Sequence, residues 1–252
     1  MVSTLDFQSK DVGPIPIPTA RSASHKMKLP LFALSLFFSV NVYAQCEHMY
    51  PAGKPTIDGN FVELCRKGYV VHYNNVQKIP FVTYEKLTPD TIGYGNVKRT
   101  SFRVDAEVAP QYRSKNKDFE KTGQIFDRGH LAAAQNAGDE EAMHDTMLLS
   151  NIVPQVNSFN RGSWKTLETR IAKIVRRGGT VFVITGVISD GSQTIGDGVA
   201  VPQYLFKVIK SDNTVLTYIL PNETNNMSYR DFKVPYSELV KKININLLPE
   251  LK

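Results

Sequence analysis

Cysteines and long apolar segments are both scarce in this sequence of 252 residues. The two cysteines, Cys46 and Cys65, form no Cys-x-x-Cys pair and have no cluster of histidines near them, so a structural zinc site is disfavoured. The most apolar segment, residues 29–40, is shorter than the about 20 residues that a membrane-spanning helix needs. After Gln45 there is neither an internal repeat nor a long linker, which predicts a single domain.

The bulk composition is that of a folded, basic protein. Apolar residues make up 42% and aromatic residues 10% of the chain, enough for one sizeable core in a domain of roughly 200 residues. The formal net charge is +6 and the pI is about 9.2. This balance favours polyanionic partners without identifying one, since many basic proteins bind no nucleic acid.

The N-terminal part has the features of an export signal. Residues 1–26 are rich in Pro, Ser and Ala and form a leader of uncertain status, either the product of an upstream start codon chosen in error or a true leader. Residues 27–44 predict a signal peptide, because a basic start precedes the apolar segment and a small residue ends it. We therefore expect an exported single domain over residues 45–252, periplasmic or extracellular, without a membrane span.

Both cysteines follow the expected cleavage site. In an exported protein we expect them to form one disulfide, which closes a loop of about 20 residues and contributes on the order of 3 kcal/mol to stability. Two unpaired thiols are the alternative. Gln45, which directly precedes Cys46, argues against a lipoprotein cleavage site at that cysteine.

Short segments rich in β-branched and aromatic residues predict the strands. These segments are 68–73, 81–87, 180–188, 204–209 and 214–220. Residues 180–186 are almost entirely apolar, which predicts a central strand covered on both faces.

Three helices are expected as well. Acidic residues from Asp139 onward favour a helix start, where carboxylates interact well with the helix dipole. A second helix covers about 162–177, where apolar residues recur at helical spacing and two glycines end the pattern. A third covers 237–242. The mixture predicts an α+β fold with a mostly antiparallel central sheet and flanking helices.

Of the five histidines, His130 has the most distinctive surroundings. The others lie in the leader, beside the cysteines, in a predicted strand and in the acidic helix: His25, His48, His72 and His144. For the one in the strand we expect a structural side chain. His130 ends the segment Asp-Arg-Gly-His and is followed by small residues that allow other backbone to come close. A neutral imidazole can take a proton from water near pH 7, so a catalytic and a structural role are both open.

Two further segments supply oxygen donors. Asn151 lies in Ser-Asn-Ile-Val-Pro-Gln, and Asn160 begins Asn-Arg-Gly-Ser-Trp at the head of a predicted helix. Hard divalent cations prefer oxygen ligands and keep several waters, so one Asn carbonyl can suffice when a phosphate supplies another oxygen. Helix capping is the ordinary alternative for Asn160. In an unbroken helix, Glu168 would lie about 12 Å along the axis from Asn160, so it would act through water.

The order and spacing of these three segments resemble the DNA/RNA non-specific endonucleases. That family includes secreted sugar-non-specific nucleases and mitochondrial endonuclease G, and it belongs to the ββα-metal (His-Me finger) group. The resemblance extends over most of residues 45–252, with specific central motifs and flanking segments that only support them. It implies a ββα-metal finger active site within the α+β fold.

The resemblance also implies a role for each residue of the metal site. His130 would be the general base that takes a proton from the attacking water. Asn160 would be the protein ligand of Mg²⁺, and Glu168 would hold the waters of the metal. Asn151 would orient the site from beside the metal. Mn²⁺ would be accepted nearly as well, since an amide-and-water site discriminates weakly between the two ions.

Arginines would meet the charge of the phosphate. The resemblance implies that Arg128 helps to bind or stabilise it, and that an arginine further upstream contributes as well. Arg99 and Arg103 are the candidates for this upstream arginine, and Arg99 is preferred. Guanidinium groups bind phosphate oxygens in pairs, which suits a pentacoordinate phosphate. Asp127 is expected to be structural, holding the turn or Arg128.

These inferences predict a secreted, Mg²⁺-dependent endonuclease that hydrolyses DNA and RNA with little sequence preference. Contacts to phosphate carry little sequence information, and both sugars are accepted if no group reads the 2′-OH. One alternative is a secreted nucleic-acid-binding protein with the same fold but no catalysis, against which the intact His130 and Asn160 argue. Another is a phosphodiesterase that acts on a small nucleotide or a phospholipid. The sequence leaves the oligomeric state open.

Overall fold

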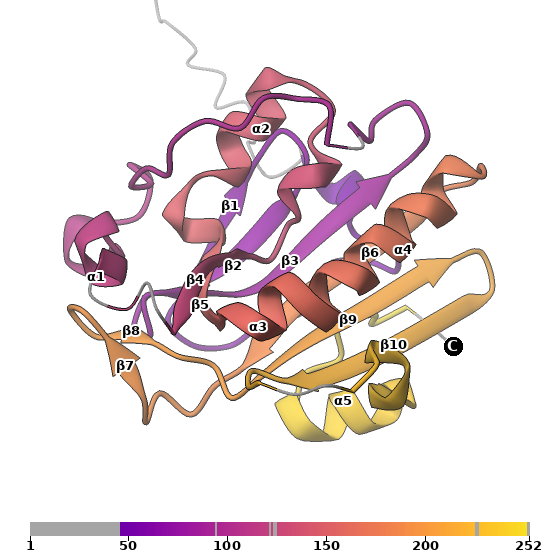
Figure 1. The fold of residues 1–252 in the computed structure, drawn as a ribbon. Helices are drawn as coiled ribbons and strands as arrows, with labels where there is room; N and C mark the ends of the chain where they lie inside the picture. Colours follow the sequence, from indigo (N-terminus) through magenta and orange to yellow (C-terminus); the bar gives the residue numbers. More distant parts are fainter. Residues whose placement is uncertain (1–45, 94, 121, 123–124, 225–226, 251–252) are drawn as a thin grey trace, which may run out of the picture. The chain divides into compact units, whose positions relative to one another are not determined.

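The computed structural model describes residues 46–250 except residues 94, 121, 123–124 and 225–226 (Figure 1). The leader predicted at 1–26 and the signal peptide predicted at 27–44 lie outside the described residues. Each helix in the described part of the chain is too short or too polar to span a membrane.

A seven-stranded antiparallel sheet in the order β1-β2-β3-β6-β9-β10-β11 forms the centre of the fold (Figure 1). Its strands are β1 (Phe61–Cys65), β2 (Val70–Asn74), β3 (Ile79–Leu87), β6 (Val181–Ile188), β9 (Tyr204–Ser211), β10 (Thr214–Pro221) and β11 (Lys233–Val234). The five predicted strand segments all lie in this sheet, and β1 and β11 are additional. Strand β6 lies in the middle and is mostly buried, as its apolar sequence predicted.

Two short ribbons accompany the sheet. They pair β4 (Phe126–His130) with β5 (Ile152–Val156), and β7 (Thr194–Ile195) with β8 (Val199–Ala200).

The α-helices include the three that the sequence predicts. The helices are α1 (Asn116–Glu120), α2 (Glu140–Thr146), α3 (Asn157–Phe159), α4 (Lys165–Arg176) and α5 (Tyr236–Ile243). Shorter 3₁₀ turns are η2 (Glu47–Met49), η3 (Pro110–Tyr112), η4 (Ala134–Asn136), η5 (Leu149–Asn151) and η7 (Tyr229–Phe232), and a π turn forms η6 (Asn160–Trp164). Helix α2 follows Asp139, whose side chain accepts a hydrogen bond from the backbone N–H of Ala142 at 2.8 Å and caps the helix.

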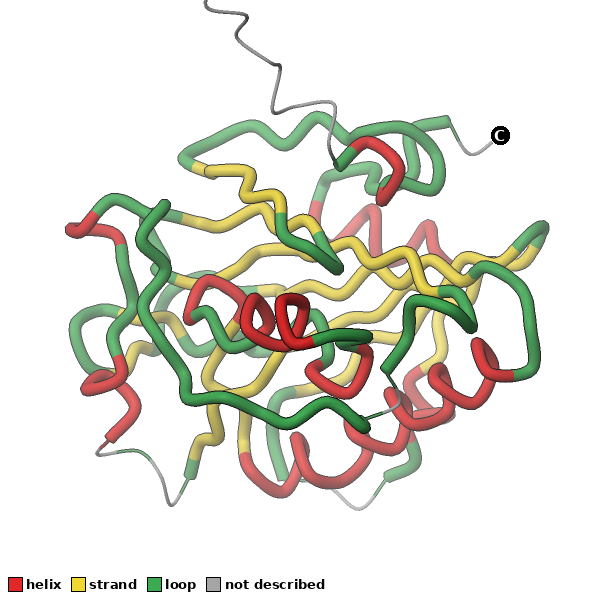
Figure 2. Tube along the Cα trace, turned by 90° about the horizontal axis from the view of Figure 1, so that it is seen from above, coloured by secondary structure: helices red, strands yellow, loops and turns green. Residues whose placement is uncertain are grey.

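Helices cover both faces of the sheet (Figure 2). On one face, Leu167 and Ile171 of α4 pack in the same core cluster as Val183 of β6. On the other, Leu239 of α5 packs in a cluster with Phe206 of β9. Successive residues of a strand point to opposite faces, so a strand between two such layers must be apolar throughout. Each fully buried side chain of this size contributes about 1.5–3 kcal/mol.

Cys46 and Cys65 form the predicted disulfide, with Cα atoms 5.9 Å apart. The bond ties the first described residue to the end of β1. Both cysteines are therefore accounted for, and the alternative of free thiols is wrong.

The three motif segments form one ββα unit. Strands β4 and β5 pair antiparallel, with Asp127 opposite Gln155 and His130 opposite Ile152. From β5 the chain continues through α3 and η6 into α4. Gly129 permits this pairing, because a Cβ atom there would lie 2.1 Å from the Cδ atom of Gln155. The predicted α+β fold with flanking helices is confirmed, and the motifs lie together on the two short strands and the helix after them.

Candidate active site

A cleft of about 490 Å³ lies where β4 meets the beginning of α4. It is lined by Arg99, Phe102, Phe119, Phe126, Asp127, Arg128, His130, Ala134, Gln135, Asn160, Arg161, Lys165 and Glu168. Most of the predicted site residues, far apart in the sequence, therefore share one cleft. Asn151 is the exception.

His130 ends β4 with a neutral ring. Its Nε2 atom is buried and has no hydrogen-bond partner among the described residues. The ring centroid lies 5.5 Å from that of Phe102. Burial lowers the pKa of His130 to about 3, and the positive charge of Arg99 adds to the shift. The imidazole is thus uncharged at pH 7, the form that a general base requires, and an anionic phosphate in the cleft would oppose the shift.

The helix that follows Asn160 is interrupted. Residues Asn160–Trp164 form a π turn, and Gly162 has the non-helical dihedral angles φ −100° and ψ −111°. Regular α-helix begins only at Lys165. The axial separation derived for an unbroken helix therefore does not apply, and Asn160 and Glu168 both line the cleft.

Asp127 holds the amide of Asn160 and the guanidinium of Arg161. Its Oδ2 accepts a hydrogen bond from Nδ2 of Asn160 at 2.9 Å. Arg161 donates to both carboxylate oxygens, from Nε at 2.9 Å and from Nη2 at 2.6 Å. Burial raises the pKa of Asp127, but the hydrogen bonds from Arg161 and Asn160 outweigh it and hold the pKa below its usual value. Asp127 is structural as expected, yet its partners are these two side chains and not Arg128.

The oxygen donors of the cleft fit a hard divalent cation. Because Asn160 donates Nδ2 to Asp127, its carbonyl oxygen is the atom left to accept. Glu168 lines the same cleft and brings a carboxylate to it. Mg²⁺ prefers oxygen ligands and retains several waters, so a single amide oxygen with a carboxylate nearby suits it. Within the described residues, no group of three or more His, Cys, Asp and Glu side chains could form a richer metal site.

A buried lysine connects Glu168 to the centre of the sheet. Nζ of Lys207 lies 3.6 Å from Oε1 of Glu168, the distance of an ion pair and too long for a hydrogen bond. It donates to Oγ1 of Thr185 at 2.8 Å and lies 4.5 Å from the centroid of the Trp164 ring. Burial lowers the pKa of Lys207, and the two carboxylates of Glu168 and Glu85 oppose this shift.

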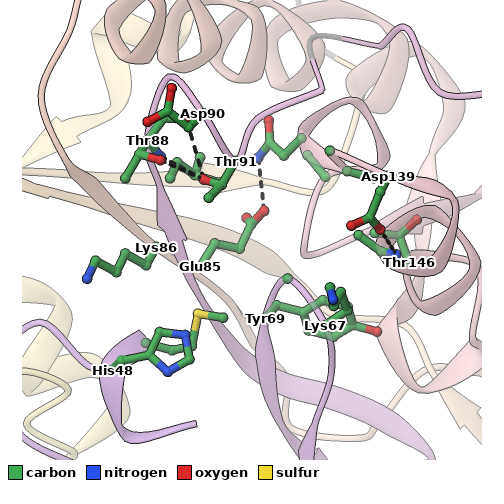
Figure 3. Close-up of a pocket in the computed structure, with 18 residues that line it drawn as sticks. His48, Lys67, Tyr69, Glu85, Lys86, Thr88, Asp90, Thr91, Asp139 and Thr146 are labelled. Atoms are coloured by element: carbon green, nitrogen blue, oxygen red, sulfur yellow. Dashed lines mark hydrogen bonds between the residues drawn. The ribbon is translucent and has the colours of Figure 1, made fainter. Parts of the chain in front are cut away.

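Glu85 is the second carboxylate that interacts with Lys207. Burial raises the pKa of Glu85 to about 7, against the charge of Lys207 and a hydrogen bond that Asn136 donates at 2.9 Å. Burial also raises the pKa of Glu168, again against Lys207. Glu85 lines a separate cavity of about 410 Å³ (Figure 3). Two carboxylates thus share one buried cation.

Arg128 is fixed at the cleft by aromatic side chains. Its guanidinium carbon lies 5.7 Å from the ring centroid of Phe102 and 5.3 Å from that of Phe119. Nη2 donates to the carbonyl oxygen of Asn116 at 3.0 Å, while Nε is buried without a hydrogen-bond partner among the described residues. The guanidinium therefore keeps a donor for an anion.

Arg99 and Arg103 lie in different surroundings. Arg99 lines the cleft, and its charge contributes to the low pKa of His130. Arg103 hydrogen-bonds with the His144 ring and donates to the carbonyl oxygen of His144 at 2.6 Å. Arg103 is absent from the residues that line the cleft. This placement agrees with the preference for Arg99.

Asn151 acts on the backbone behind the cleft. The side chain is fully buried, and its Oδ1 accepts from the N–H of Ala132 at 2.9 Å. Nδ2 donates to the carbonyl oxygens of Ala132 and Thr146, each at 3.0 Å. These bonds fix the segment that follows His130. Asn151 would therefore orient the site through this backbone segment, and its place beside the metal stays a prediction.

Lys207 and Glu85 were not predicted as site residues. Lys207 lies on β9 two residues after Leu205 and two before Ile209, which are both buried. Alternation places all three on the same face of the sheet, and a lysine at such a position needs a buried acidic partner. A lysine at an apolar position of β9 was the sequence feature that could have indicated a buried ion pair. Its acidic partners come from β3 and α4, which the sequence of β9 cannot indicate.

Comparison with known proteins agrees with this geometry. The family model for DNA/RNA non-specific endonucleases matches residues 48–252. The chain is 31% identical over 216 residues to the mitochondrial nuclease of Saccharomyces cerevisiae, covering 74% of this chain and 65% of that protein. It is 32% identical over 207 residues to the mitochondrial endonuclease G of Homo sapiens, covering 74% and 69%. With nuclease C1 of Cunninghamella echinulata var. echinulata it shares 32% identity over 228 residues, covering 81% and 89%.

A solved structure has the same fold. The crystal structure of the EndoG/EndoGI complex contains a chain that superposes with a TM-score of 0.73 at 27% identity. The match covers 82% of this chain and 93% of that one. With the family match over nearly all described residues and the motif side chains gathered on a single ββα unit, the chain belongs to the DNA/RNA non-specific endonuclease family.

Proposed function

We propose that this protein is an exported, metal-dependent endonuclease that hydrolyses phosphodiester bonds of DNA and RNA with little sequence preference. The observation that carries the proposal is that His130 and Asn160 line the same cleft. Membership of the nuclease family supports the reaction class. The names of two relatives place those proteins in mitochondria. For this chain we propose export to the periplasm or the medium, because residues 27–44 have the pattern of a signal peptide.

In the proposed mechanism His130 is the general base. Its neutral imidazole accepts a proton from the attacking water. A group of this kind contributes about 10²- to 10⁴-fold to the rate. Arg99 raises the local positive potential and thereby keeps the ring neutral until phosphate enters.

The remaining residues of the cleft bind and orient. Arg128 and Arg99 hold phosphate oxygens through their guanidinium donors, which suits the charge of a pentacoordinate phosphate. The carbonyl oxygen of Asn160 would hold a Mg²⁺ ion, with Glu168 accepting hydrogen bonds from its waters. When bound, the ion supplies Lewis-acid stabilisation of the negative charge on the phosphate. We propose Mg²⁺ as the ion, and Mn²⁺ would serve in the same site.

Digestion of polymers in the presence and absence of metal tests this function. The purified protein is expected to cut plasmid DNA and a long RNA into fragments with Mg²⁺ or Mn²⁺, and to stop cutting when a chelator removes the ion. DNA that is retarded in a gel without fragments, whatever the metal, would instead indicate a binding protein without catalysis. Hydrolysis of a dinucleotide or a phospholipid but of no polymer would indicate a small-substrate phosphodiesterase.

Replacing Asp127 by alanine should weaken metal use more than catalysis at saturation. The carboxylate fixes the amide of Asn160 in the orientation that presents its carbonyl oxygen. Loss of such an outer partner of a metal ligand typically costs about 10- to 100-fold in metal affinity. We therefore expect the Mg²⁺ concentration for half-maximal digestion to rise by about this factor.

The matched control for Asp127→Ala is Arg161→Gln. It removes the exposed guanidinium from Asp127 but leaves the hydrogen bond between Asp127 and Asn160. We expect a smaller rise in the Mg²⁺ requirement for the control. If both variants needed as much Mg²⁺ as the unaltered protein, the assignment of Asp127 as the positioning residue of Asn160 would be wrong.

A further inference from the structure

The outward face of α4 is cationic. Lys165, Arg170 and Lys173 are exposed on it, and Thr166 and Thr169 lie between them. At 3.6 residues per turn these five side chains cover about 140° of the helix surface, the side opposite the buried stripe. The acidic residue of the helix, Glu168, lies on the inner side against Lys207.

Hollows on the surface connect this face to the active-site cleft. A hollow of about 510 Å³ shares Arg161 and Lys165 with the cleft and extends to Lys173. A further hollow of about 320 Å³ shares Arg170 and Arg230 with the first. Lys233 also lines this second hollow. The cleft and both hollows thus form a continuous series, and among the described residues neither hollow is lined by Asp or Glu.

The cations of this face are available to a ligand. In the described part of the chain, no acidic side chain forms an ion pair with Lys165, Arg170 or Lys173. Arg230 is exposed and lies 4.9 Å from the ring centroid of Tyr229. The acidic neighbour Asp231 uses its carboxylate to accept from the backbone N–H of Ser228.

Some lysines elsewhere in the described part of the chain are paired. Lys54, Lys67 and Lys78 each lie within ion-pair distance of a carboxylate, those of Glu63, Glu141 and Asp197. On the outward face of α4, the cations from Lys165 to Lys233 line hollows that lead out of the cleft and whose described lining contains no carboxylate. Like charges gathered in this way repel one another, and an incoming polyanion relieves the repulsion.

We propose that the outward face of α4 with the adjoining η7 and β11 is a binding track for the backbone of the nucleic-acid substrate beyond the scissile phosphate. We call it the α4 track and define it by Arg161, Lys165, Arg170, Lys173, Arg230 and Lys233. This inference rests on the proposed function, and it assigns the residues that make a polymer a better substrate than a short fragment.

The dimensions of the α4 track fit several nucleotides. Lys165 and Lys173 are separated by about 12 Å along the helix axis. A duplex rises about 3.4 Å per base pair, so this part alone extends along about three to four base-pair steps. Lysine and arginine contacts to phosphate read no sequence. The α4 track therefore increases affinity for long substrates and leaves the weak sequence preference as it is.

The salt dependence of DNA binding tests the α4 track. In the variant Arg170→Gln/Lys173→Gln/Arg230→Gln, three phosphate contacts are lost. Each contact contributes about 0.9 to the slope of log affinity against log salt, so the slope should become shallower by about 2.7. Between about 50 and 200 mM salt, the unaltered protein should then lose about 40-fold more affinity for a labelled duplex of about 30 base pairs than the variant does. Fluorescence anisotropy in the presence of a chelator measures this without cleavage.

The matched control is Lys241→Gln/Lys242→Gln. These lysines are exposed on α5, which covers the other face of the sheet. The control is expected to keep both the slope and the digestion rate of the unaltered protein. The triple variant should also lose affinity for the long duplex far more than for a dinucleotide, whose single step of about 3.4 Å is shorter than the about 7.5 Å along the helix axis from Lys165 to Arg170. A slope in the triple variant equal to that of the control would overturn the proposal.

The same experiment separates this inference from the proposed function. Normal digestion with an unchanged slope in the triple variant would remove the α4 track and leave the nuclease assignment. No digestion by any form of the protein, together with a shallower slope in the triple variant, would remove the nuclease assignment and leave a nucleic-acid-binding surface.

Discussion

His130→Ala is expected to lower the rate of DNA and RNA digestion at saturating Mg²⁺ by about 10²- to 10⁴-fold, the contribution of a positioned general base. Burial and Arg99 hold the pKa of the imidazole near 3, so the ring is neutral at pH 7, the form that the proposed base requires. Because the carbonyl oxygen of Asn160 and the guanidinium of Arg128 remain, the variant should still bind DNA and Mg²⁺. Single-turnover digestion of a labelled duplex measures the loss at the chemical step.

The loss in His130→Ala should not come from unfolding. Nε2 of His130 has no hydrogen-bond partner among the described residues, so the truncation breaks no bond there. We expect a thermal unfolding midpoint close to that of the unaltered protein. His144→Ala is the matched control, because His144 is exposed on α2 and paired with Arg103 outside the cleft. Equal digestion rates for the two variants would show that His130 is not the base.

The central sheet could be predicted because its strands are apolar on both sides. Strand β6 alternates between two core clusters, so its sequence has no polar face to confuse the assignment. Strand β4 is different. Its sequence, Phe-Asp-Arg-Gly-His, lacks apolar alternation, and its extended form depends on pairing with β5, from which a long segment separates it. The ββα unit was therefore accessible only through resemblance.

The positions of the site residues were predictable to different degrees. His130 and Asn160 belong to local motifs, and the structure places both in one cleft. The course of the chain between Asn160 and Glu168 was not predictable. Asn-Arg-Gly-Ser-Trp is compatible with an ordinary helix start, whereas the structure breaks the helix at Gly162. Partners such as Asp127 for Asn160, or Ala132 for Asn151, come from segments that only the fold brings together.

The buried charged residues could not be predicted from the sequence either, and they matter for stability. The three residues lie on different elements, Lys207 on β9, Glu85 on β3 and Glu168 on α4. Lysine and glutamate are usually surface residues, so none of the three alone indicates burial. Only the fold brings the single cation next to both carboxylates. Without a cation the two buried carboxylates would repel each other and would be poorly solvated, so the stability of this layer depends on Lys207.

Lys207→Met is accordingly expected to destabilise the protein by about 3–5 kcal/mol at pH 8, the range for removal of one partner from a buried ion pair. The pKa of Glu85 is already raised to about 7, and that of Glu168 is raised too, although Lys207 opposes both shifts. Without Lys207 both values rise further. A carboxyl whose folded pKa lies above its unfolded value stabilises the folded state at low pH and loses that contribution as the pH rises through the folded pKa. The loss should therefore be larger at pH 8 than at pH 5.

Denaturant unfolding at the two pH values measures this difference, and Lys210→Met is the matched control. Lys210 lies on the same strand but is only partly buried and donates to the carbonyl oxygen of Asp212, so its replacement should cost less than about 1 kcal/mol at either pH. Adding Glu85→Gln to Lys207→Met should recover part of the stability at pH 8, because one of the two uncompensated carboxylates is then neutral. If Lys207→Met had the same free energy of unfolding as the control at both pH values, Lys207 would not be what stabilises the two buried carboxylates.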